Sequence, residues 1–305
     1  MAETAHGGVR PDNNFAVVPL SDGIGAEVRG ADLGKPFSDA QFDTIYRAWL
    51  EHLVLLFRSQ SLTDPQMIDF SRRFGDLDLA PIPGHGRAFV EGLPEMFVIS
   101  NVIEDGRNIG SLGDGECLWH TDMAWTPVPA KASCLYSLEV PEAEGDTGFL
   151  NMYAAYETLS PDLRDRIGGL TIKHDTQYTL DGLDRNGGQS LKDAKASGTF
   201  DVVTIPGVSH PIVRTHPETD RKALYIGRRQ NTYVNGLSAD ESEALLDALW
   251  AHAETCGRQT LHHRWRVGDL LIWDNRCVMH RRDEFSAAAR RIMHRTQVRA
   301  DAAPA

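Results

Sequence analysis

The sequence predicts a mainly β protein with flanking helices, built around a jelly-roll core. Much of the chain consists of short runs rich in β-branched and aromatic residues, which Gly, Pro and Asp separate. The 305 residues show no repeat, no low-complexity linker and no change in composition, and 41% of them are hydrophobic. A chain of this size can bury a core without disulfides. Many short strands with helices outside them are typical of a jelly-roll barrel.

The predicted domain runs from residue 15 to residue 299 as a single unit. Residues 1–14 and the tail 300–305 lack any apolar pattern, so we expect both to be disordered. Between Phe15 and Val28 the chain is expected to form short strands around a Gly-rich turn. The apolar run 53–57 is typical of a buried strand.

Four helices are predicted from residues that commonly begin and end helices. Three of them begin with a capping box, in which a Ser or Thr side chain and a Glu or Gln three residues later bond each other's backbone amides. Glycines end two of the helices. The signals are, in chain order, Ser38 with Gln41, Thr63 with Gln66 and a stop at Gly75, Ser160 with a stop at Gly168, and Ser238 with Glu241.

The remaining elements are predicted to be strands, apart from one long loop. The expected strands are 132–140, 201–215, 222–227, 269–275 and 291–298. The segment 179–199 differs from them, because it is rich in Gly, Asp and Lys and has no apolar period. A loop of this length inside a compact domain is commonly functional. We therefore predict an active-site lid at 179–199.

Composition limits the class of partner. The formal net charge of −12 argues against non-specific binding to nucleic acid or to an anionic membrane. The four cysteines have no CxxC spacing, and no apolar run approaches the ~20 residues of a membrane span. The first residues also lack a signal-peptide pattern. We expect a cytoplasmic protein that forms a homo-oligomer and binds a small molecule, with no nucleic-acid or membrane partner.

One short motif has the residue types of a metal site. In WHTDMAW, His120 and Asp122 are two residues apart, so an extended backbone places both side chains on one face. His280, which follows the predicted strand 269–275, is the best candidate for a third ligand. Two histidines and one carboxylate form the facial triad of non-haem Fe(II) oxygenases, which leaves three metal positions open. A chance His-x-Asp pair is the alternative interpretation of the motif alone.

A second motif, RRIMHRTQV, suggests an anion site. In a strand, Arg291 and Arg295 face the same way, and a guanidinium binds a carboxylate through two parallel hydrogen bonds. Thr147 follows a Gly-Asp turn, where a hydroxyl can help to hold a carboxylate. Taken singly, the arginines can also be surface charges, and the threonine can be an ordinary turn residue.

The order WHTD, GDT, WDNRxxxHR and RxxxR resembles the TauD/TfdA family of 2-oxoglutarate-dependent dioxygenases. The resemblance extends over nearly the whole chain, from GAEVRGADL at 25–33 through SRRFG at 71–75 to the last arginines. It implies a double-stranded β-helix fold with flanking helices. It also implies roles for six residues: His120, Asp122 and His280 bind Fe(II), Thr147 and Arg291 bind the distal carboxylate of 2-oxoglutarate, and Arg295 binds the acidic group of the substrate.

The implied reaction hydroxylates a small anionic substrate, such as a carboxylate, sulfonate or sulfate ester, with O2 as a further cosubstrate. The reaction is coupled to decarboxylation of 2-oxoglutarate to succinate and CO2. Near positions where the family contacts its substrate, this chain has Glu116 and His85, which we include as candidate substrate-binding residues. Two alternatives stay open on the residues alone: a zinc hydrolase with the same ligands, and a non-catalytic barrel that senses 2-oxoglutarate.

Overall fold

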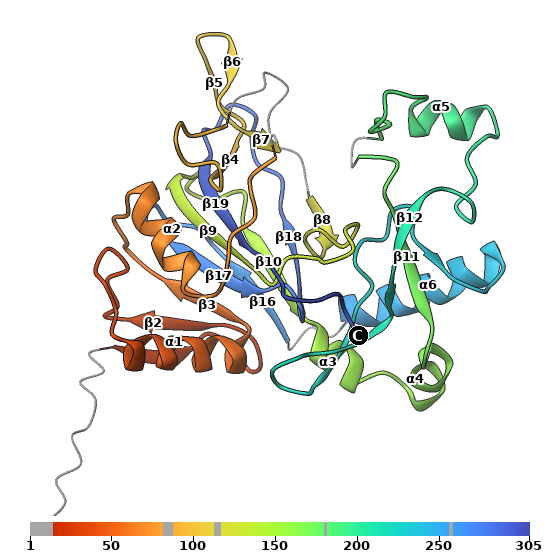
Figure 1. The fold of residues 1–305 in the computed structure, drawn as a ribbon, viewed down its shortest axis with the longest axis horizontal. Coiled ribbons are helices and arrows are strands. Elements are labelled where there is room, and N and C mark those ends of the chain that lie inside the picture. Colours follow the sequence, from red (N-terminus) through yellow and green to blue (C-terminus); the bar gives the residue numbers. More distant parts are fainter. Residues whose placement is uncertain (1–14, 82–87, 113–116, 180–181, 256–258) are drawn as a thin grey trace, which may run out of the picture.

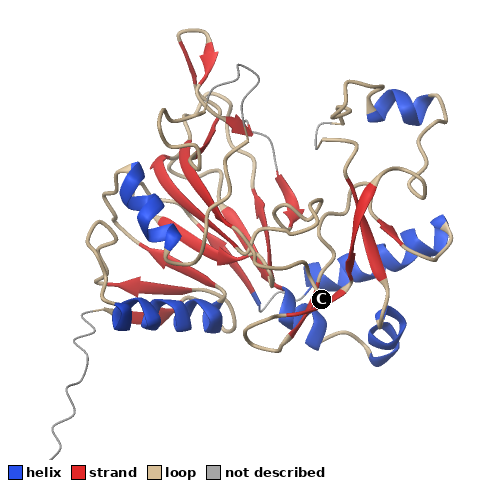
Figure 2. Ribbon diagram, in the orientation of Figure 1, coloured by secondary structure: helices blue, strands red, loops and turns tan. Residues whose placement is uncertain are grey.

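The protein is rich in β-strands, and its helices lie at the periphery (Figures 1 and 2). This arrangement was obtained as a computed structural model, which describes residues 15–81, 88–112, 117–179, 182–255 and 259–305. It confirms the prediction of a mainly β protein with flanking helices.

The larger of the two main sheets has eight strands. Its strands lie in the order β1 (Ala16–Pro19), β2 (Ala26–Arg29), β3 (Val54–Phe57), β17 (Leu270–Asp274), β9 (Ala132–Glu139), β19 (Ile292–Val298), β4 (Phe97–Ser100) and β7 (Ser111–Leu112). The central strand β3 is fully buried, which agrees with its unbroken apolar sequence. Because β19 pairs with both β4 and β9, the segment that carries the paired arginines is fixed on both edges.

The smaller sheet carries most of the motif residues. Its strands lie in the order β16 (Thr260–His263), β10 (Thr147–Asn151), β18 (Val278–Arg282) and β8 (Cys117–His120), and every neighbouring pair is antiparallel. The pairing of β18 with β8 places His280 opposite His120. Two motifs that lie 160 residues apart in the chain therefore meet at one position of this sheet.

The hydrophobic core lies between the two sheets. The rings of Phe149 on β10 and Trp273 on β17 lie 5.5 Å apart, and both side chains are buried in one large apolar cluster. A second cluster lies on the other face of the larger sheet, under α1 (Asp39–His52) and α2 (Asp64–Arg72). The larger sheet is thus covered on both faces, by helices on one side and by the smaller sheet on the other (Figure 1).

The four helices predicted from capping signals are present. Ser38 and Thr63 each form the complete capping box, Ser160 caps α4 (Pro161–Ile167), and Ser238 bonds Glu241 at the start of α6 (Ala239–Thr255). The predicted stop at Gly75 is late, because α2 ends at Arg72. Two short helices, α3 (Met152–Glu157) and α5 (Leu191–Ala196), were not predicted. Asn151 and Ser190 cap them, and each helix is too short to show a helical apolar period.

The remaining strands form three small sheets. They are β12 (Gly207–Pro211), β11 (Thr171–Asp175) and β15 (Tyr233–Val234), then β13 (Val213–Thr215) with β14 (Lys222–Leu224), and β5 (Ile103–Glu104) with β6 (Arg107–Asn108). The single strand predicted at 201–215 is wrong in its first part. Residues 202–204 form a turn, and a bend at Ile212 separates β12 from β13.

Only one of the two chain ends that were expected to be disordered is described by the structure. Residues 1–14 lie outside the described part. The tail 300–305 is described, and the amide of Thr215 donates a 2.8 Å hydrogen bond to the carbonyl of Ala305. The division into one domain with disordered ends stays a prediction. In the described part of the chain, no helix is long and apolar enough to cross a membrane.

Candidate metal centre and its pocket

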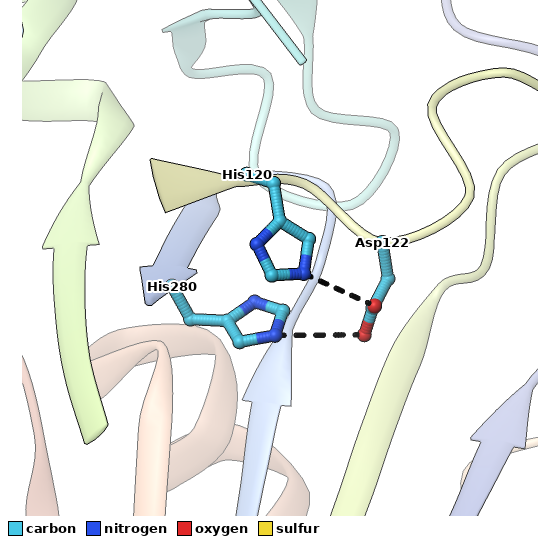
Figure 3. A group of neighbouring side chains, drawn as sticks. All are labelled: His120, Asp122 and His280. Carbon is cyan, nitrogen blue, oxygen red and sulfur yellow. Dashed lines mark ion pairs between the residues drawn. The ribbon is translucent and has the colours of Figure 1, made fainter. Parts of the chain in front are cut away.

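Three side chains converge at the rim of the smaller sheet. His120 is the last residue of β8, Asp122 lies in the loop that follows, and His280 is the central residue of β18. The sequence had placed His280 just after the preceding strand, but it lies in a strand of its own. The Nε2 atoms of the two histidines lie 3.7 and 4.0 Å from the two carboxylate oxygens of Asp122 (Figure 3). All three ligand atoms lie within 4.8 Å of one another.

The protonation states of these groups suit a divalent cation. The Nδ1 atom of His120 lies 2.8 Å from the Leu118 carbonyl, which can only accept, so Nδ1 carries the proton and Nε2 has a lone pair. Burial, together with the adjacent His120 ring, lowers the pKa of His280 to about 3. Burial would raise the pKa of Asp122, but Arg295 and both histidines hold it well below its usual range. The imidazole lone pairs of His120 and His280 and the negative charge of Asp122 are therefore available to one cation.

Hydrogen bonds fix the carboxylate and its loop. The Ser133 hydroxyl donates a 2.8 Å bond to Asp122 Oδ2, and Arg295 Nη1 lies 3.3 Å from Oδ1. Asn275, which is fully buried, accepts from the Asp122 amide and donates to the carbonyls of Asp122 and Ala130. Asn275 thus positions the backbone of Asp122.

A second cluster, His216 with Asp274 and Cys277, also has ligand atoms within 4.8 Å of one another, but its lone pairs are in use. Both oxygens of Asp274 accept hydrogen bonds from Arg276, and one of them also bonds His216 Nε2. His216 Nδ1 accepts from two backbone amides, so the proton lies on Nε2 and is donated to Asp274. This cluster braces the turn before β18 and offers no imidazole lone pair to a metal.

The converging side chains open onto a large pocket. It has a volume of about 580 Å³ and is lined by both histidines, by Thr147 and by five arginines, which are Arg228, Arg229, Arg282, Arg291 and Arg295. Its apolar wall consists of Ile99, Leu118, Leu135 and the indoles of Trp119, Trp250 and Trp273. Helix α6 forms an outer wall with Asp247, Trp250 and Glu254.

Arg291 is a buried cation that lines this pocket. Its side chain is 2% exposed, and it forms no ion pair with any residue that the structure describes. Burial and the nearby Arg282 guanidinium lower the pKa of Arg291 to about 9, which shows that its positive charge is poorly solvated. A buried cation of this kind favours a bound anion. Thr147, which is 2% exposed, lines the same pocket.

Gly145 explains why a Gly-Asp turn precedes Thr147. Its φ is +72°, a conformation that glycine adopts without strain. A Cβ atom at this position would lie 3.2 Å from the Phe285 ring and 3.5 Å from the side chain of Arg291. The turn therefore lets the backbone approach the guanidinium closely.

Comparison with known proteins identifies the family. The chain matches the family described as "Taurine catabolism dioxygenase TauD, TfdA family" over residues 16–297. The chain belongs to the TauD/TfdA family. This match favours a dioxygenase over the zinc hydrolase and the sensor that the residues alone had left open.

Individual TauD/TfdA relatives are similar over almost their whole length. The (S)-phenoxypropionate/alpha-ketoglutarate-dioxygenase of Sphingobium herbicidovorans is 35% identical over 297 residues, which cover 95% of this chain and 96% of that protein. The alpha-ketoglutarate-dependent 2,4-dichlorophenoxyacetate dioxygenase of Cupriavidus pinatubonensis is 35% identical over 292 residues, with 93% and 97% coverage. The crystal structure of AAD-2 with Mn(II) and N-oxalylglycine superposes with a TM-score of 0.74 at 28% identity, with 95% and 99% coverage.

The structure of this TauD/TfdA enzyme adds detail to one predicted pocket residue and reveals a second one. Arg295 lines the pocket as expected, but it already contacts Asp122 and lies over the Phe97 ring at 5.0 Å. Arg282 was not anticipated, although it follows His280 by two residues on one strand and so shares its face. Arg282 lies opposite Thr147 in the β10–β18 pairing.

Other predicted site residues fall at or beyond the limits of the described structure. Glu116 and His85 lie outside the described residues, and so do positions 180–181 of the predicted lid. The described part of the lid contains α5, and Arg185 lies 4.5 Å from the centre of the Trp125 ring. Because Trp125 follows Asp122 by three residues, this contact joins the lid segment to the loop of the metal centre.

Proposed function

We propose that this TauD/TfdA enzyme is an Fe(II)-dependent hydroxylase of a small anionic organic acid, with 2-oxoglutarate and O2 as cosubstrates. The observation that carries the proposal is that one pocket contains both a candidate metal site and a buried cation. Three ligand atoms converge there within 4.8 Å, and Arg291 lines the same pocket without an ion-pair partner among the described residues. Family membership gives the reaction class, and these residues give candidate binding sites for the metal and for an anionic ligand.

His120, Asp122 and His280 would hold the iron. Two imidazoles and one carboxylate leave three positions for a bidentate keto acid and oxygen, which is the ligand set of non-haem Fe(II) oxygenases. When bound, iron with 2-oxoglutarate and O2 supplies decarboxylation to succinate and CO2, coupled to hydroxylation of a substrate C–H bond. The protein holds the ligand carboxylate in place through Ser133 and Asn275.

Thr147 and Arg291 would bind the distal carboxylate of 2-oxoglutarate. A hydroxyl and a guanidinium that line the same pocket as the candidate metal ligands would recognise the far end of a dicarboxylate bound at the metal. The guanidinium of Arg282 adds positive charge beside Arg291, since it is close enough to lower the pKa of Arg291.

Arg295 would bind the acidic group of the primary substrate. Its contact with Asp122 places it beside the metal centre, so an anion held there presents its neighbouring carbon to the iron. Ile99, Leu118 and the indoles around the pocket would enclose an apolar body. Carboxylates, sulfonates and sulfate esters are the candidate acids. The phenoxypropionate and dichlorophenoxyacetate in the names of the two relatives support a carboxylate. Glu116 and His85 stay candidate contacts with the rest of the substrate.

Four further properties remain proposals. The two facing sheets support a double-stranded β-helix core, and the antiparallel pairing throughout the smaller sheet agrees with it. The segment 179–199 is proposed to act as a lid. A cytoplasmic location and a homo-oligomeric state are also proposed, and both rest on the sequence alone.

Anaerobic titration with Fe(II) and 2-oxoglutarate tests the proposed function. The wild-type protein is expected to develop the visible charge-transfer absorbance of an Fe(II)–keto acid chelate. On admission of O2, it should form succinate faster with an anionic substrate from a panel of carboxylates, sulfonates and sulfate esters. The His280→Ala variant should lose the absorbance, whereas His262→Ala, at a half-exposed histidine away from the pocket, should keep it. A wild-type protein without the absorbance, or without O2-dependent succinate, would contradict the proposal.

A further inference from the structure

Thr147 is held by a second buried residue that does not itself reach the pocket. The indole Nε1 of Trp265 donates a 2.9 Å hydrogen bond to the hydroxyl of Thr147, and the two side chains are 3% and 2% exposed. Thr147 lines the pocket, whereas Trp265 belongs to the apolar core behind it. Trp265 follows β16, whose His263 is paired opposite Thr147. The Trp265 ring packs edge-on against the His263 ring at 4.6 Å.

This bond restricts where the hydroxyl hydrogen of Thr147 can point. An indole N–H only donates, so it occupies one lone pair of the hydroxyl oxygen and excludes the hydrogen from that direction. No residue in the described part of the chain accepts a hydrogen bond from the Thr147 hydroxyl. Thr147 is also fixed from both sides, because β10 pairs with β16 and with β18. The hydrogen is therefore available to a ligand in the pocket that Thr147 and Arg291 line.

The bond from Trp265 is not a general requirement of buried indoles in this protein. The indole nitrogens of Trp49, Trp250 and Trp273 are buried and have no hydrogen-bond partner among the residues that the structure describes. The fold therefore tolerates unpaired indole N–H groups elsewhere, while the one at position 265 donates to Thr147, which lines the pocket.

We propose that Trp265 is a positioning residue for the cosubstrate. It orients the Thr147 hydroxyl to donate to the distal carboxylate that Arg291 binds. The proposal rests on the proposed function, since it takes 2-oxoglutarate as the ligand. It predicts that Trp265 contributes to selection of a dicarboxylate over a 2-oxo acid whose far end is a methyl group.

Equilibrium binding to the Mn(II)-loaded protein tests this role without turnover. The probes are 2-oxoglutarate and 2-oxopentanoate, which has the same chain length but no distal carboxylate. Trp265→Phe keeps an aromatic ring and removes the N–H. It should raise the dissociation constant of 2-oxoglutarate about three- to tenfold, the effect of one net hydrogen bond. The dissociation constant of 2-oxopentanoate should not change. Trp49→Phe, a buried indole in the other core, should affect neither ligand.

A double-mutant cycle with Thr147→Val separates positioning from packing. In the Thr147→Val background, Trp265→Phe should have no further effect on 2-oxoglutarate binding, because the hydroxyl that it orients is gone. If Trp265→Phe does not fold, 3-benzothienylalanine at position 265 keeps the shape of the indole and removes the N–H. An unchanged 2-oxoglutarate constant, equal weakening of both acids, or additive effects in the cycle would each overturn the role of Trp265. A wild-type protein that binds neither acid would instead contradict the proposed function.

Discussion

Arg290 and Arg291 are adjacent in the chain and have opposite environments. Arg290 is exposed and forms ion pairs with Glu139 and Glu104. Arg291 points into the pocket and is 2% exposed. Both residues lie immediately before the first residue of β19, Ile292, and one side chain enters the pocket while the other faces solvent. The pair RR in the sequence therefore contains one surface charge and one candidate anion site.

Substitution of these neighbours tests the cosubstrate site. Arg291→Ala should weaken 2-oxoglutarate binding about ten- to a hundredfold, because charge-assisted hydrogen bonds contribute about 1.5–3 kcal/mol each. Arg290→Ala is the matched control, and it should leave the constant unchanged because its partners are exposed carboxylates. The dissociation constant is measured by anaerobic titration. Equal effects of the two substitutions would remove Arg291 from the binding site.

Arg295 should affect the primary substrate more than the cosubstrate. At saturating iron, Arg295→Ala is expected to raise the Michaelis constant for the acid substrate far more than the Michaelis constant for the keto acid cosubstrate. Saturating iron is needed because Arg295 also contacts the ligand carboxylate of Asp122. Steady-state kinetics with each substrate varied in turn gives the two constants. Efficient turnover of the uncharged methyl ester of the best acid would show that Arg295 does not hold the substrate anion.

At the scale of residues, contacts between residues close in the sequence could be predicted, and contacts between distant residues mostly could not. His120 and Asp122 lie close together in the sequence, so their shared face could be predicted from the spacing alone. The position of His280 after a predicted strand made it only the best candidate for the third ligand, because its approach to His120 depends on the pairing of two distant strands. Trp265 and Ser133 gave no signal, since their bonds to Thr147 and Asp122 depend on the packing of separate strands.

The described part of the segment 179–199 packs apart from the two large apolar clusters. Helix α5 lies in a small separate cluster with Tyr178 and Phe200. The contact between Arg185 and Trp125 is a cation–π interaction at a partly exposed ring. Such a segment opens at low free energy, because few apolar contacts have to be lost.

Hydrogen exchange tests the proposed lid. Peptides from residues 182–199 should exchange faster than peptides from β9 in the substrate-free protein, because β9 is paired on both edges. Binding of metal, 2-oxoglutarate and substrate should slow exchange in the lid peptides while β9 changes little. Equal slow exchange in both states would identify a fixed structural loop.

Helices that begin with capping residues were predicted well. Helices and strands whose limits depend on contacts with distant parts of the chain were not. The capping boxes at Ser38 and Thr63 involve residues three apart, so the sequence alone determines them. Helix α5 begins at Ser190, but its lysines and alanines give no apolar period, and its Leu191 is buried only by the small cluster. The break at Ile212 likewise separates two strands that pair with different partners.

At the scale of the whole molecule, the candidate metal centre joins strands and loops that are far apart in the chain. The ligands come from β8, the loop after it, and β18. Asn275 ties this loop to the turn before β18, and the amide of Thr121 donates to the carbonyl of Gly227. A metal ion bound here would cross-link all of these segments. Ligands that bind only the folded state stabilise it by mass action.

Divalent metal should therefore raise the melting temperature. At a free concentration of about one hundred times the dissociation constant, the expected stabilisation is about 2.7 kcal/mol. Differential scanning fluorimetry with Mn(II) should show an upward shift for the wild type and none for His280→Ala. Cys277→Ala, in the second cluster, should keep the full shift because that cluster offers no imidazole lone pair. Loss of the shift in Cys277→Ala alone would place the metal at the second cluster.

Helix α6 gives the enzyme a separable region for changes in substrate range. Asp247, Trp250 and Glu254 face the pocket from a single helix, at spacings of three and four residues. The three candidate metal ligands, Thr147 and Arg291 all lie on other elements. In laboratory evolution, a library confined to these three helical positions would vary the acid that is accepted while the oxidative machinery stays constant. Natural substitutions confined to this helix would act in the same way, changing the accepted substrate without changing the reaction.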